Sequence, residues 1–287
     1  MAHDLQIGRD CVGGCVHFEF LIRQWAAYAG ALTDPADWLD WASRPVAFPP
    51  QDADTVPPLS EMPAMMRRRI DRLGRMACQV AYWCHEPRED VPVVFASRYG
   101  DAARSLALLG DLAQGQPLSP TGFGLSVHNA VAALYSMARG DTANSVVVAA
   151  GRATVAAALT EAAGLLADGA PEVLVVYYES PLPADYACFH DEPALDYAWA
   201  WRVAAAHVEP APQKGVRVAL SVGEAGGQLR SVSTDVAQPA MPAGLAVLHQ
   251  VLSVWQARQG LVADKLASLQ RPHDRPGAAW FWSSHVA

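Results

Sequence analysis

Residues 119–179 restrict the possible folds more than any other part of the chain. Two short runs of almost continuous apolar residues, Ser145–Ala150 and Val173–Tyr178, predict buried strands. Apolar residues at helical spacing predict helices over Val127–Ala138 and Ala153–Leu166. Strands that are apolar on both faces and alternate with helices are typical of a parallel-type sheet covered on both sides. The sequence therefore predicts an α/β fold.

The rest of the chain continues this alternation. Further strands are predicted at Val16–Ile22, residues 91–101, Leu195–His207 (where a helix is the alternative), Val216–Val222 and Trp280–Trp282, the last as a strand or a plug. Further helices are predicted at Thr33–Trp41, residues 64–84, Ala102–Leu112 and Met241–Trp255. Prolines between residues 44 and 63 predict a loop. The strand within residues 91–101 ends in Ser-Arg-Tyr-Gly, where Gly100 is expected to supply a positive φ.

Composition argues against several classes of function. The net charge of −8 argues against a nucleic-acid-binding surface spread over the whole protein. No apolar run is long enough to cross a bilayer, so we expect no membrane span. The N-terminal segment lacks an apolar signal core, and five scattered cysteines fit a reduced, cytoplasmic setting. Cys11 and Cys15 lack a second Cys/His pair at zinc-like spacing, so we expect neither a metal nor another cofactor.

The turn from Val148 to Thr154 lies where a nucleophile usually stands in such a fold. A residue at the carboxyl end of a buried strand lies beside the positive N-terminal end of the next helix. This turn contains neither Cys nor Ser, and its only hydroxyl, on Thr154, is expected to cap the helix. Arg152 stands within the turn, and its guanidinium stays protonated at neutral pH. We therefore expect no acyl-accepting group here.

The same stretch resembles the β-ketoacyl synthases of the thiolase fold. In those enzymes a Ser-Pro segment leads to a helix bearing an Asn, then to a strand, and then to an Ala-Cys turn that carries the attacking thiol. Ser119-Pro120, Asn129 and the Val146–Ala150 strand match these features. Counting forward from Ser119-Pro120 and backward from Gly169 places the family's Cys position at Arg152 in both cases. The resemblance therefore implies a synthase-like protein without the catalytic cysteine.

The resemblance covers about residues 12–205 and implies a single thiolase-like half-fold, a mixed five-stranded sheet with helices on both faces. Residues 206–287 are expected to form a short C-terminal extension that packs on this domain. A complete synthase has a second half, which supplies two catalytic histidines in His-Gly-Thr-type and Asn-Phe-Gly-type contexts. Neither context occurs in this sequence. This departure from the family pattern again implies a noncatalytic protein.

Six segments, in order, resemble a narrower subgroup of synthase-like proteins that have the N-terminal synthase domain alone. They are Trp38 with Trp41, Met62–Met65, Arg67–Arg69, Ser97–Asp101, Ser119–Phe123 and Ser126–Ala130. This subgroup looks like the chain-length factors of aryl-polyene-type polyketide biosynthesis. The implied function is that of a noncatalytic partner in a heterodimer with a catalytic β-ketoacyl synthase, with acyl carrier protein as a further partner.

The resemblance also implies two groups of site residues. In the thiolase fold, subunits pair through the strand here at Val146–Ala149, and the Val127–Ala138 helix lies at the seam, where its side chains would set the depth of the partner's acyl tunnel. The tunnel and interface residues implied are Ser126, Val127, His128, Asn129, Val131, Tyr135, Val146, Val147, Val148 and Arg152. The carrier-protein docking residues implied are Arg67, Arg68, Arg69 and Arg72, a basic group on an acidic protein.

Alternative interpretations stay open at this point. The arginines are also compatible with a solvated helix face. His128 is compatible with a capping role as well as with a place at the seam. Arg152 is compatible with a salt bridge at the interface or with filling the site where a thioester would form. For the whole chain, the alternatives are an independent acyltransferase or thioester hydrolase that uses His128 with a hydroxyl, and a homodimeric acyl-binding protein.

Overall fold

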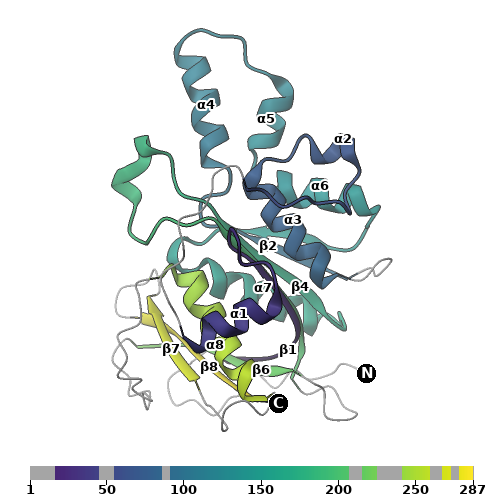
Figure 1. The fold of residues 1–287 in the computed structure, drawn as a ribbon, viewed down its shortest axis with the longest axis vertical. Helices are drawn as coiled ribbons and strands as arrows, with labels where there is room; N and C mark the ends of the chain where they lie inside the picture. The colour runs from purple at the N-terminus through teal and green to yellow at the C-terminus, as the bar shows by residue number, and fades with distance from the viewer. Residues whose placement is uncertain are drawn as a thin grey trace.

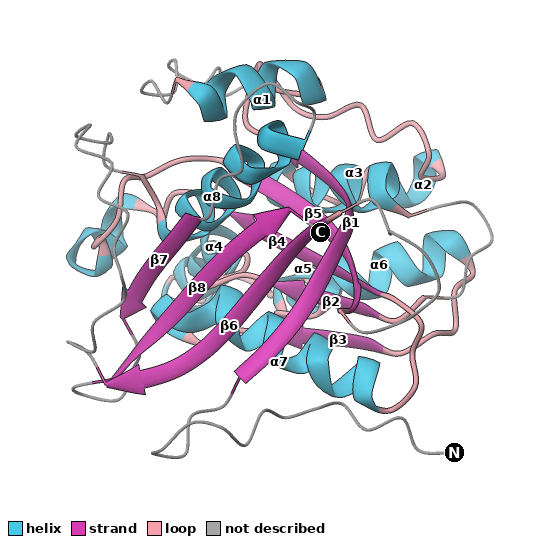
Figure 2. Ribbon diagram, turned by 90° about the horizontal axis from the view of Figure 1, so that it is seen from below, coloured by secondary structure: helices cyan, strands magenta, loops and turns pink. Residues whose placement is uncertain are grey.

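The strands of the chain form one continuous sheet. A computed structural model describes residues 17–44, 55–85, 91–206, 215–224, 241–258, 267–272 and 278–286. Within these ranges eight strands are ordered β3-β2-β4-β5-β1-β6-β8-β7 (Figures 1 and 2). The strands are β1 (His17–Tyr28), β2 (Val93–Ala96), β3 (Ser145–Val148), β4 (Val173–Glu179), β5 (Tyr197–Ala205), β6 (Val216–Glu224), β7 (Ala267–Pro272) and β8 (Ala278–Val286). β2 is parallel to β3 and to β4, and the other neighbouring pairs are antiparallel.

The α/β class is confirmed, but the sheet is larger than predicted. The family resemblance implies a five-stranded sheet, whereas the described residues form a sheet of eight strands. The additional strands β6, β8 and β7 come from the C-terminal segment, and β6 pairs with β1 from Val216 opposite Ile22 to Ser221 opposite His17. Local periodicity predicts each strand separately. It does not say whether a tail continues the sheet, because that depends on which sheet edge is free.

Helices cover both faces of this sheet (Figure 2). The helices of the described residues are α1 (Pro35–Ser43), α2 (Ala64–Arg67), α3 (Arg72–Cys84), α4 (Ala102–Ala113), α5 (Pro120–Ser126), α6 (Ala130–Arg139), α7 (Thr154–Ala167) and α8 (Ala243–Arg258), with short 3-10 turns η1 (Gly151–Ala153) and η2 (Ala184–Phe189). One core cluster joins α1, α7 and α8 to the sheet, and a second joins α3 and α6 to it. α4 and α5 form a hairpin that stands away from the sheet (Figure 1). Of the helices described, none has the length and apolar character that a membrane crossing requires.

Strand β5 shows why both faces of the sheet are buried. Trp199 and Trp201 face the cluster with α7 and α8, while Ala198 and Ala200 face the cluster with α3. Successive side chains of a strand point to opposite faces, so a strand that is apolar throughout needs cover on both. The small alanines let α3 approach closely, and the Sγ of Cys84 lies 3.5 Å from the carbonyl oxygen of Ala200.

The helix predicted over residues 64–84 is interrupted. The structure has α2 and α3 with a turn between them, and the carboxylate of Asp71 accepts a hydrogen bond from the Gly74 N–H at 3.0 Å. Asp71 therefore caps the N-terminus of α3, where a negative charge is favourable. The prediction of one helix was wrong because it placed this capping residue inside the helix. The interruption also moves Arg67, Arg68 and Arg69 out of α3.

The helix predicted from Val127 begins only at Ala130. α5 ends at Ser126, and Val127 has an extended backbone with φ −70° and ψ 146°, which no α-helix continues. α6 then runs to Arg139 and ends at Gly140, whose φ of 65° is the left-handed conformation common after a helix. Val127, His128 and Asn129 therefore form a turn between two helices.

The C-terminal helix α8 is held to the core by aromatic contacts. The indole N–H of Trp199 donates to the carbonyl oxygen of Gly244 at 3.1 Å. The ring of His249 meets that of Trp41 edge-on, with centroids 5.4 Å apart. Gly244 leaves no room for a side chain, because a Cβ there would lie 2.3 Å from the ring of Tyr177. The close approach of α8 to β4 and β5 therefore depends on glycine at this position.

Gly244→Ala should lower the free energy of unfolding by about 1–3 kcal/mol, because an overpacked core must shift to accept the added methyl group. Gly164→Ala is the matched control, since Gly164 lies within α7 and nothing stands within 4 Å of an added Cβ. Because alanine has the higher helix propensity, the control should be neutral or stabilising by up to about 1 kcal/mol. Urea unfolding followed by circular dichroism measures both variants. Equal effects would contradict this packing of α8.

Candidate functional site

Three chain reversals meet at one end of the parallel part of the sheet. Since β2 runs parallel to β3 and β4, the carboxyl ends of these three strands lie at the same end of the sheet. Ligands of open α/β sheets usually bind at this end. The reversals are the turn Ser97–Gly100 after β2, the turn Ala149–Arg152 after β3, which we call the elbow, and residues 180–196 after β4, which we call the 180–196 loop.

The elbow carries a cation. Gly151 has a φ of 52° and opens the short η1 turn. The hydroxyl of Thr154 accepts a hydrogen bond from the Ala150 N–H at 3.0 Å and donates to the carbonyl oxygen of Gly151 at 2.7 Å. Thr154 therefore ties the elbow to the start of α7. The prediction that it caps the helix was wrong, because the N-cap is Ala153 and the Thr154 hydroxyl bonds the backbone of the elbow instead. Arg152 projects from the elbow with 49% of its side chain exposed.

Two arginines share one carboxylate where the reversals meet. Asp191, in the 180–196 loop, accepts hydrogen bonds from both terminal nitrogens of Arg98 at 2.6 and 2.9 Å and from the Nε of Arg152 at 2.8 Å. The Nη2 of Arg152 also lies 2.7 Å from the same carboxylate. The guanidinium of Arg98, followed by that of Arg152, holds the pKa of Asp191 well below its usual range. Arg152 thus makes an ion pair within the chain, and the two alternatives raised for it, an ion pair at a subunit interface and a place in the thioester site, stay predictions.

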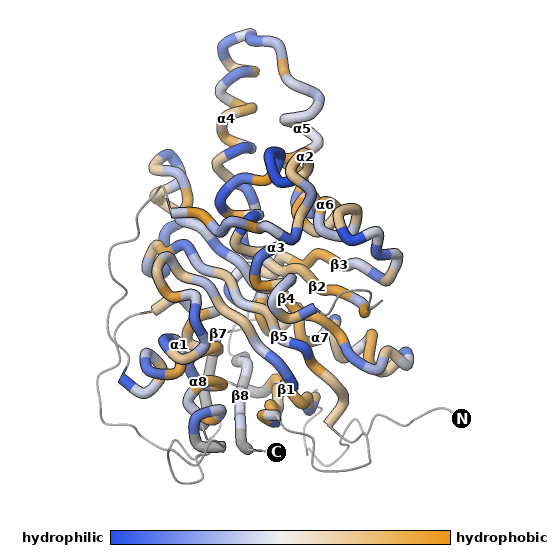
Figure 3. Tube along the Cα trace, turned by 45° about the vertical axis from the view of Figure 1, so that its right-hand side comes forward, coloured by the Kyte–Doolittle hydropathy of each residue, from blue (hydrophilic) through white to orange (hydrophobic). Residues whose placement is uncertain are grey.

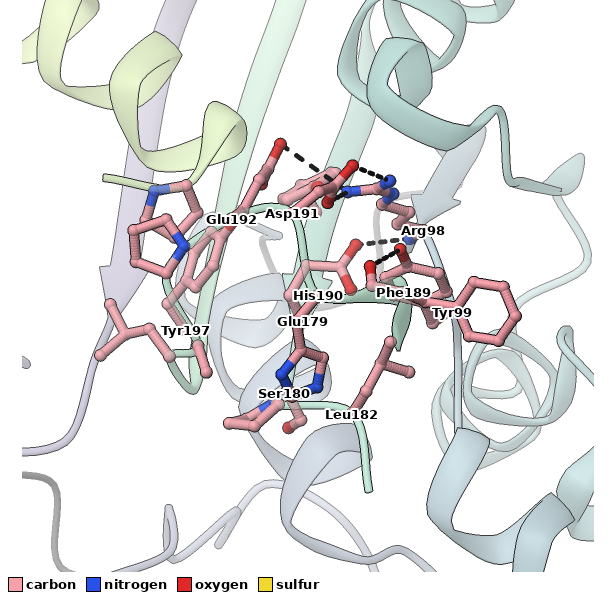
Figure 4. Close-up of a pocket in the computed structure, with 16 residues that line it drawn as sticks. Arg98, Tyr99, Glu179, Ser180, Leu182, Phe189, His190, Asp191, Glu192 and Tyr197 are labelled. Atoms are coloured by element: carbon pink, nitrogen blue, oxygen red, sulfur yellow. Dashed lines mark hydrogen bonds and ion pairs between the residues drawn. The ribbon is translucent and has the colours of Figure 1, made fainter. Parts of the chain in front are cut away.

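A half-buried acid, Glu179, ends β4 beside these ion pairs (Figure 4). Its carboxylate accepts hydrogen bonds from the Arg98 N–H and from the Ser97 hydroxyl, the latter at 3.4 Å. Loss of hydration on burial raises the pKa of Glu179 to about 8, although the hydrogen bond from the Arg98 N–H opposes this shift. Glu179 lines a small cavity that is open to solvent and whose walls include Tyr177, Tyr197 and the 180–196 loop.

The sequence does not single out Glu179, because its burial depends on the loop that follows it. The neighbouring Ser97 is fully buried, and its hydroxyl accepts the Gly100 N–H at 2.8 Å. Ser97 therefore supports the turn after β2 and does not face the cavity. Chemically, the site combines an arginine-paired carboxylate with a carboxyl group that binds a proton near neutral pH.

His128 packs against the turn after β2. Its Nε2 lies 3.5 Å from the carbonyl oxygen of Val148, at the end of β3. A Cβ at Gly100 would lie 2.5 Å from the Nδ1 of His128, and Gly100 has the positive φ that the sequence predicts, 59°. His128 thus joins β3 to the Ser97–Gly100 turn. This placement favours a structural role over the alternative in which His128 activates a hydroxyl.

The second candidate site is the sheet edge at β3. In the part of the sheet that the structure describes, β3 pairs with β2 alone. Ser145 is exposed, and Val146, Val147 and Val148 are half-buried. An edge strand offers a row of backbone amides and carbonyls to another chain. A short apolar edge of this kind is typical of strand addition between subunits.

Exposed apolar side chains lie on α6, which contacts this edge strand, and on the hairpin of α4 and α5, which contacts α6. Neither α4 nor α5 contains a buried residue, although apolar and polar residues alternate along α4 (Figure 3). α5 contacts both α4 and α6, and α6 contacts β3. The residues that we call the exposed apolar set are Leu109 (54% exposed), Leu112 (59%), Leu118 (40%), Phe123 (62%), Val127 (43%) and Met137 (61%). Apolar groups gathered on one surface are typical of a partner-binding face.

Of the exposed apolar set, only Val127 is predicted from the sequence to lie at an interface. The signal for the others is present, because Leu106, Leu109 and Leu112 recur every third residue in α4. Such a stripe predicts an amphipathic helix, but periodicity alone assigns its apolar face to the chain's own core. The hairpin projects from the sheet, so Leu109 and Leu112 are left exposed.

The predicted tunnel residues divide between a turn and a buried helix face. Ser126, Val127, His128 and Asn129 lie at the turn between α5 and α6. Tyr135 lies in the chain's own core and not on the surface where the tunnel prediction placed it. Its side chain is fully buried, and its hydroxyl lies 2.9 Å from the Nδ1 of His85. Val131, four residues before Tyr135, packs on the same core. The outward face of α6 carries Met137 instead.

The four arginines predicted to dock a carrier protein are not equivalent. Arg68 and Arg69 are exposed. Arg67 donates to the carbonyl oxygen of Leu59 at 3.2 Å. The Nε of Arg72 lies 3.0 Å from the carboxylate of Asp196, so Arg72 belongs to an internal ion pair. The break between α2 and α3 separates Arg72 from the exposed pair.

The described residues include no group of three His, Cys, Asp or Glu side chains placed to hold a metal ion. Cys78 and Cys84 are buried in α3, and burial raises the pKa of both thiols. Cys188 is exposed in η2. The Cys11 and Cys15 pair considered in the sequence analysis lies outside the described residues.

Comparisons with known proteins give one family and one fold. Residues 38–270 match the family described as beta-ketoacyl synthase, N-terminal domain. No curated protein matches significantly. The structure is similar to a ketosynthase (ApeO) in complex with its chain length factor (ApeC) from Xenorhabdus doucetiae, with a TM-score of 0.70, 25% identity, and 92% of this chain and 98% of that chain covered.

Two further solved structures share the fold at lower identity. One is the ishigamide ketosynthase/chain length factor, with a TM-score of 0.66, 15% identity, and 93% and 99% of the two chains covered. The other is the AntDE:AntF complex of a type II polyketide ketosynthase with its acyl-carrier protein, with a TM-score of 0.61, 10% identity, and 95% and 100% covered.

Glu179→Gln should remove part of the pH dependence of stability. The pKa of Glu179 is higher in the folded chain (about 8) than its ordinary value of 4.5. Its contribution to stability is therefore fully present below about pH 4.5 and is lost as the pH rises through about 8. Between about pH 5 and 8, the free energy of unfolding of the variant should fall less steeply than that of the wild type, by on the order of 1 kcal/mol per pH unit.

Urea unfolding at each pH measures these slopes. Asp185→Asn, at an exposed acid of the 180–196 loop, is the control and should keep the wild-type slope. Identical slopes for the wild type and Glu179→Gln would show that the pKa of Glu179 is not raised.

Proposed function

From the premise that the chain belongs to the β-ketoacyl synthase N-terminal-domain family, we propose that it is a noncatalytic chain-length factor. In this proposal it pairs with a catalytic β-ketoacyl synthase and shapes the tunnel that holds the growing acyl chain, in aryl-polyene-type polyketide biosynthesis. The sequence segments that resemble that subgroup support the proposal. So does the similarity to a structure described as a ketosynthase in complex with its chain length factor.

The observation that carries the proposal is the exposed apolar set beside the β3 edge. The α4–α5 hairpin buries no side chain of its own, and short helices without tertiary packing are only marginally stable in water. Covering Leu109, Leu112 and Phe123 with a partner would stabilise the hairpin by removing apolar surface from water, at about 25 cal/mol per Å². Strand addition at β3 would align the partner with this surface.

The elbow supports the noncatalytic part of the proposal. The position that aligns with the family's Cys holds Arg152, whose guanidinium is engaged by Asp191. A guanidinium that stays protonated at neutral pH cannot accept an acyl group. In the proposed pair, therefore, the catalytic synthase supplies the thiol and this chain supplies part of the wall.

The residues proposed to reach the partner's tunnel lie at the turn between α5 and α6. Val127 is the best placed, because it is 43% exposed and adjoins the apolar hairpin. Ser126 and Asn129 flank it, and Met137 extends the same surface along α6. Arg68 and Arg69, both exposed on an otherwise acidic protein, are proposed to attract an acidic acyl carrier protein to the pair.

Val127→Phe should shorten the main product of the co-expressed pair, and Val127→Ala should lengthen it, in each case by at least one extension unit. Discrimination by pocket depth is worth about 1–3 kcal/mol per methylene, so one side chain is enough to shift the product distribution. Mass spectrometry of the extracted products measures the effect. Glu161→Gln, at an exposed residue of α7, is the control. Unchanged products from both Val127 variants in an intact complex would contradict the tunnel role.

Phe123→Asp with Met137→Asp should weaken binding to the catalytic synthase by about 30-fold or more, because a buried charge replaces an apolar anchor at each position and interface anchors are worth about 2 kcal/mol or more. Both residues are more than 60% exposed, so the isolated chain should fold normally. Val56→Asp, at an exposed apolar residue outside the hairpin and β3, is the control. Size-exclusion chromatography and calorimetric titration of the co-expressed pair measure the loss. Wild-type affinity in the double variant would place the interface elsewhere.

A further inference from the structure

The 180–196 loop is closed at its base by a chain of polar contacts. The hydroxyl of Ser180 donates to one carboxylate oxygen of Asp196. The other oxygen of Asp196 lies 3.0 Å from the Nε of Arg72, at the start of α3. The two ends of the 180–196 loop are therefore close together and joined through Asp196. The base of the loop is therefore fixed to the start of α3, on the face of the sheet that α3 covers.

The tip of the loop is fixed to three other elements. Asp191 pairs with Arg98, after β2, and with Arg152, after β3. The next residue, Glu192, accepts a hydrogen bond from the Ala243 N–H at 3.1 Å, at the start of α8. The hydroxyl of Tyr99 donates to the carbonyl oxygen of Phe189 at 3.3 Å. Held at these points, the loop forms one wall of the cavity that Glu179 lines (Figure 4).

Arg98 and Arg152 do not contribute equally to holding the tip of the loop in place. Arg98 is only 14% exposed and grips both oxygens of Asp191 in the bidentate arrangement that makes arginine–carboxylate pairs strong. Arg152 is 49% exposed, and a partly solvated pair contributes less. The tip should therefore depend mainly on Asp191 and Arg98, with Arg152 adding a second and weaker hold.

We propose that Asp191 is a latch that holds the 180–196 loop in place as a wall of the Glu179 cavity, and that Arg152 is one of the two arginines that hold Asp191. Arg152 is then a positioning residue that acts through Asp191. Its presence at the elbow has a physical role in this chain, namely to join the elbow to Asp191, 39 residues further along the sequence. All the groups involved lie within this chain, so the latch does not depend on the identity of any partner.

Hydrogen–deuterium exchange of the full-length chain tests the latch, read from peptides that cover residues 184–192. Asp191→Asn should raise exchange there about ten-fold or more, because it removes the charge that both arginines bind. Arg152→Ala should raise it about two- to five-fold, because Arg98 still holds Asp191. Arg152→Lys, which keeps a cation, should raise it less than Arg152→Ala. Asp185→Asn, at an exposed acid of the same loop, is the control and should change nothing.

A double-mutant cycle separates the latch from a general loosening of the fold. In the Asp191→Asn background, Arg152→Ala should add nothing, because its partner charge is already absent. The proposal is overturned if Arg152→Ala has the same effect in both backgrounds, or if Asp191→Asn exchanges like Asp185→Asn. If Asp191→Asn also raises exchange throughout α7 and β4, that variant loosens the whole fold, and the Arg152 variants then decide whether the latch exists. A rise confined to residues 184–192 in Arg152→Ala, smaller in Arg152→Lys, supports the latch, and no rise overturns it.

Discussion

The parallel pairing of β2 with both β3 and β4 is the constraint on which the rest of the structure depends. Parallel neighbours carry their carboxyl ends at the same end of a sheet, so the chain must leave three adjacent strands at nearly one point. The turn after β2, the elbow after β3 and the 180–196 loop are close in space for this reason alone. Contacts between residues as distant in sequence as Arg98, Arg152 and Asp191 follow from it.

Two acids at this end of the sheet show how the local surroundings decide the charge. Asp191 faces two guanidinium groups, which stabilise its ionised form and lower its pKa. Glu179 lies at the end of β4 and accepts hydrogen bonds from a backbone N–H and a neutral hydroxyl. These hydrogen bonds do not offset the loss of hydration that raises the pKa of Glu179. The same sheet end therefore holds one carboxylate that is firmly ionised and one carboxyl group that binds a proton near neutral pH. Arg152 at the elbow fits this arrangement, because its positive charge helps to stabilise the ionised carboxylate of Asp191.

The two edges of the sheet differ in how they are covered. Beyond β1 the C-terminal segment adds β6, β8 and β7, and α8 packs against them and the core. At the other edge, β3 has one neighbouring strand among the described residues. The α4–α5 hairpin exposes leucine and phenylalanine side chains. Exposed edges and apolar patches favour association with another chain. A surface of this kind supports the proposal of a partner subunit more directly than any single residue does.

The sequence by itself determined the class of fold and the positions of most strands and helices, because these depend on local periodicity. Gly100 also behaves as the sequence predicts, since a positive φ in a tight turn is a local requirement. Only the tertiary structure decided which face of α6 is buried. Val127, Val131 and Tyr135 share one helical spacing, yet α6 begins after Val127, and Tyr135 packs into the chain's own core. It also decided that Arg152 meets Asp191, that Glu179 loses its hydration, and that the leucines of α4 stay exposed. Each of these depends on how elements distant in the sequence pack together, and residue spacing along the chain carries no information about that packing.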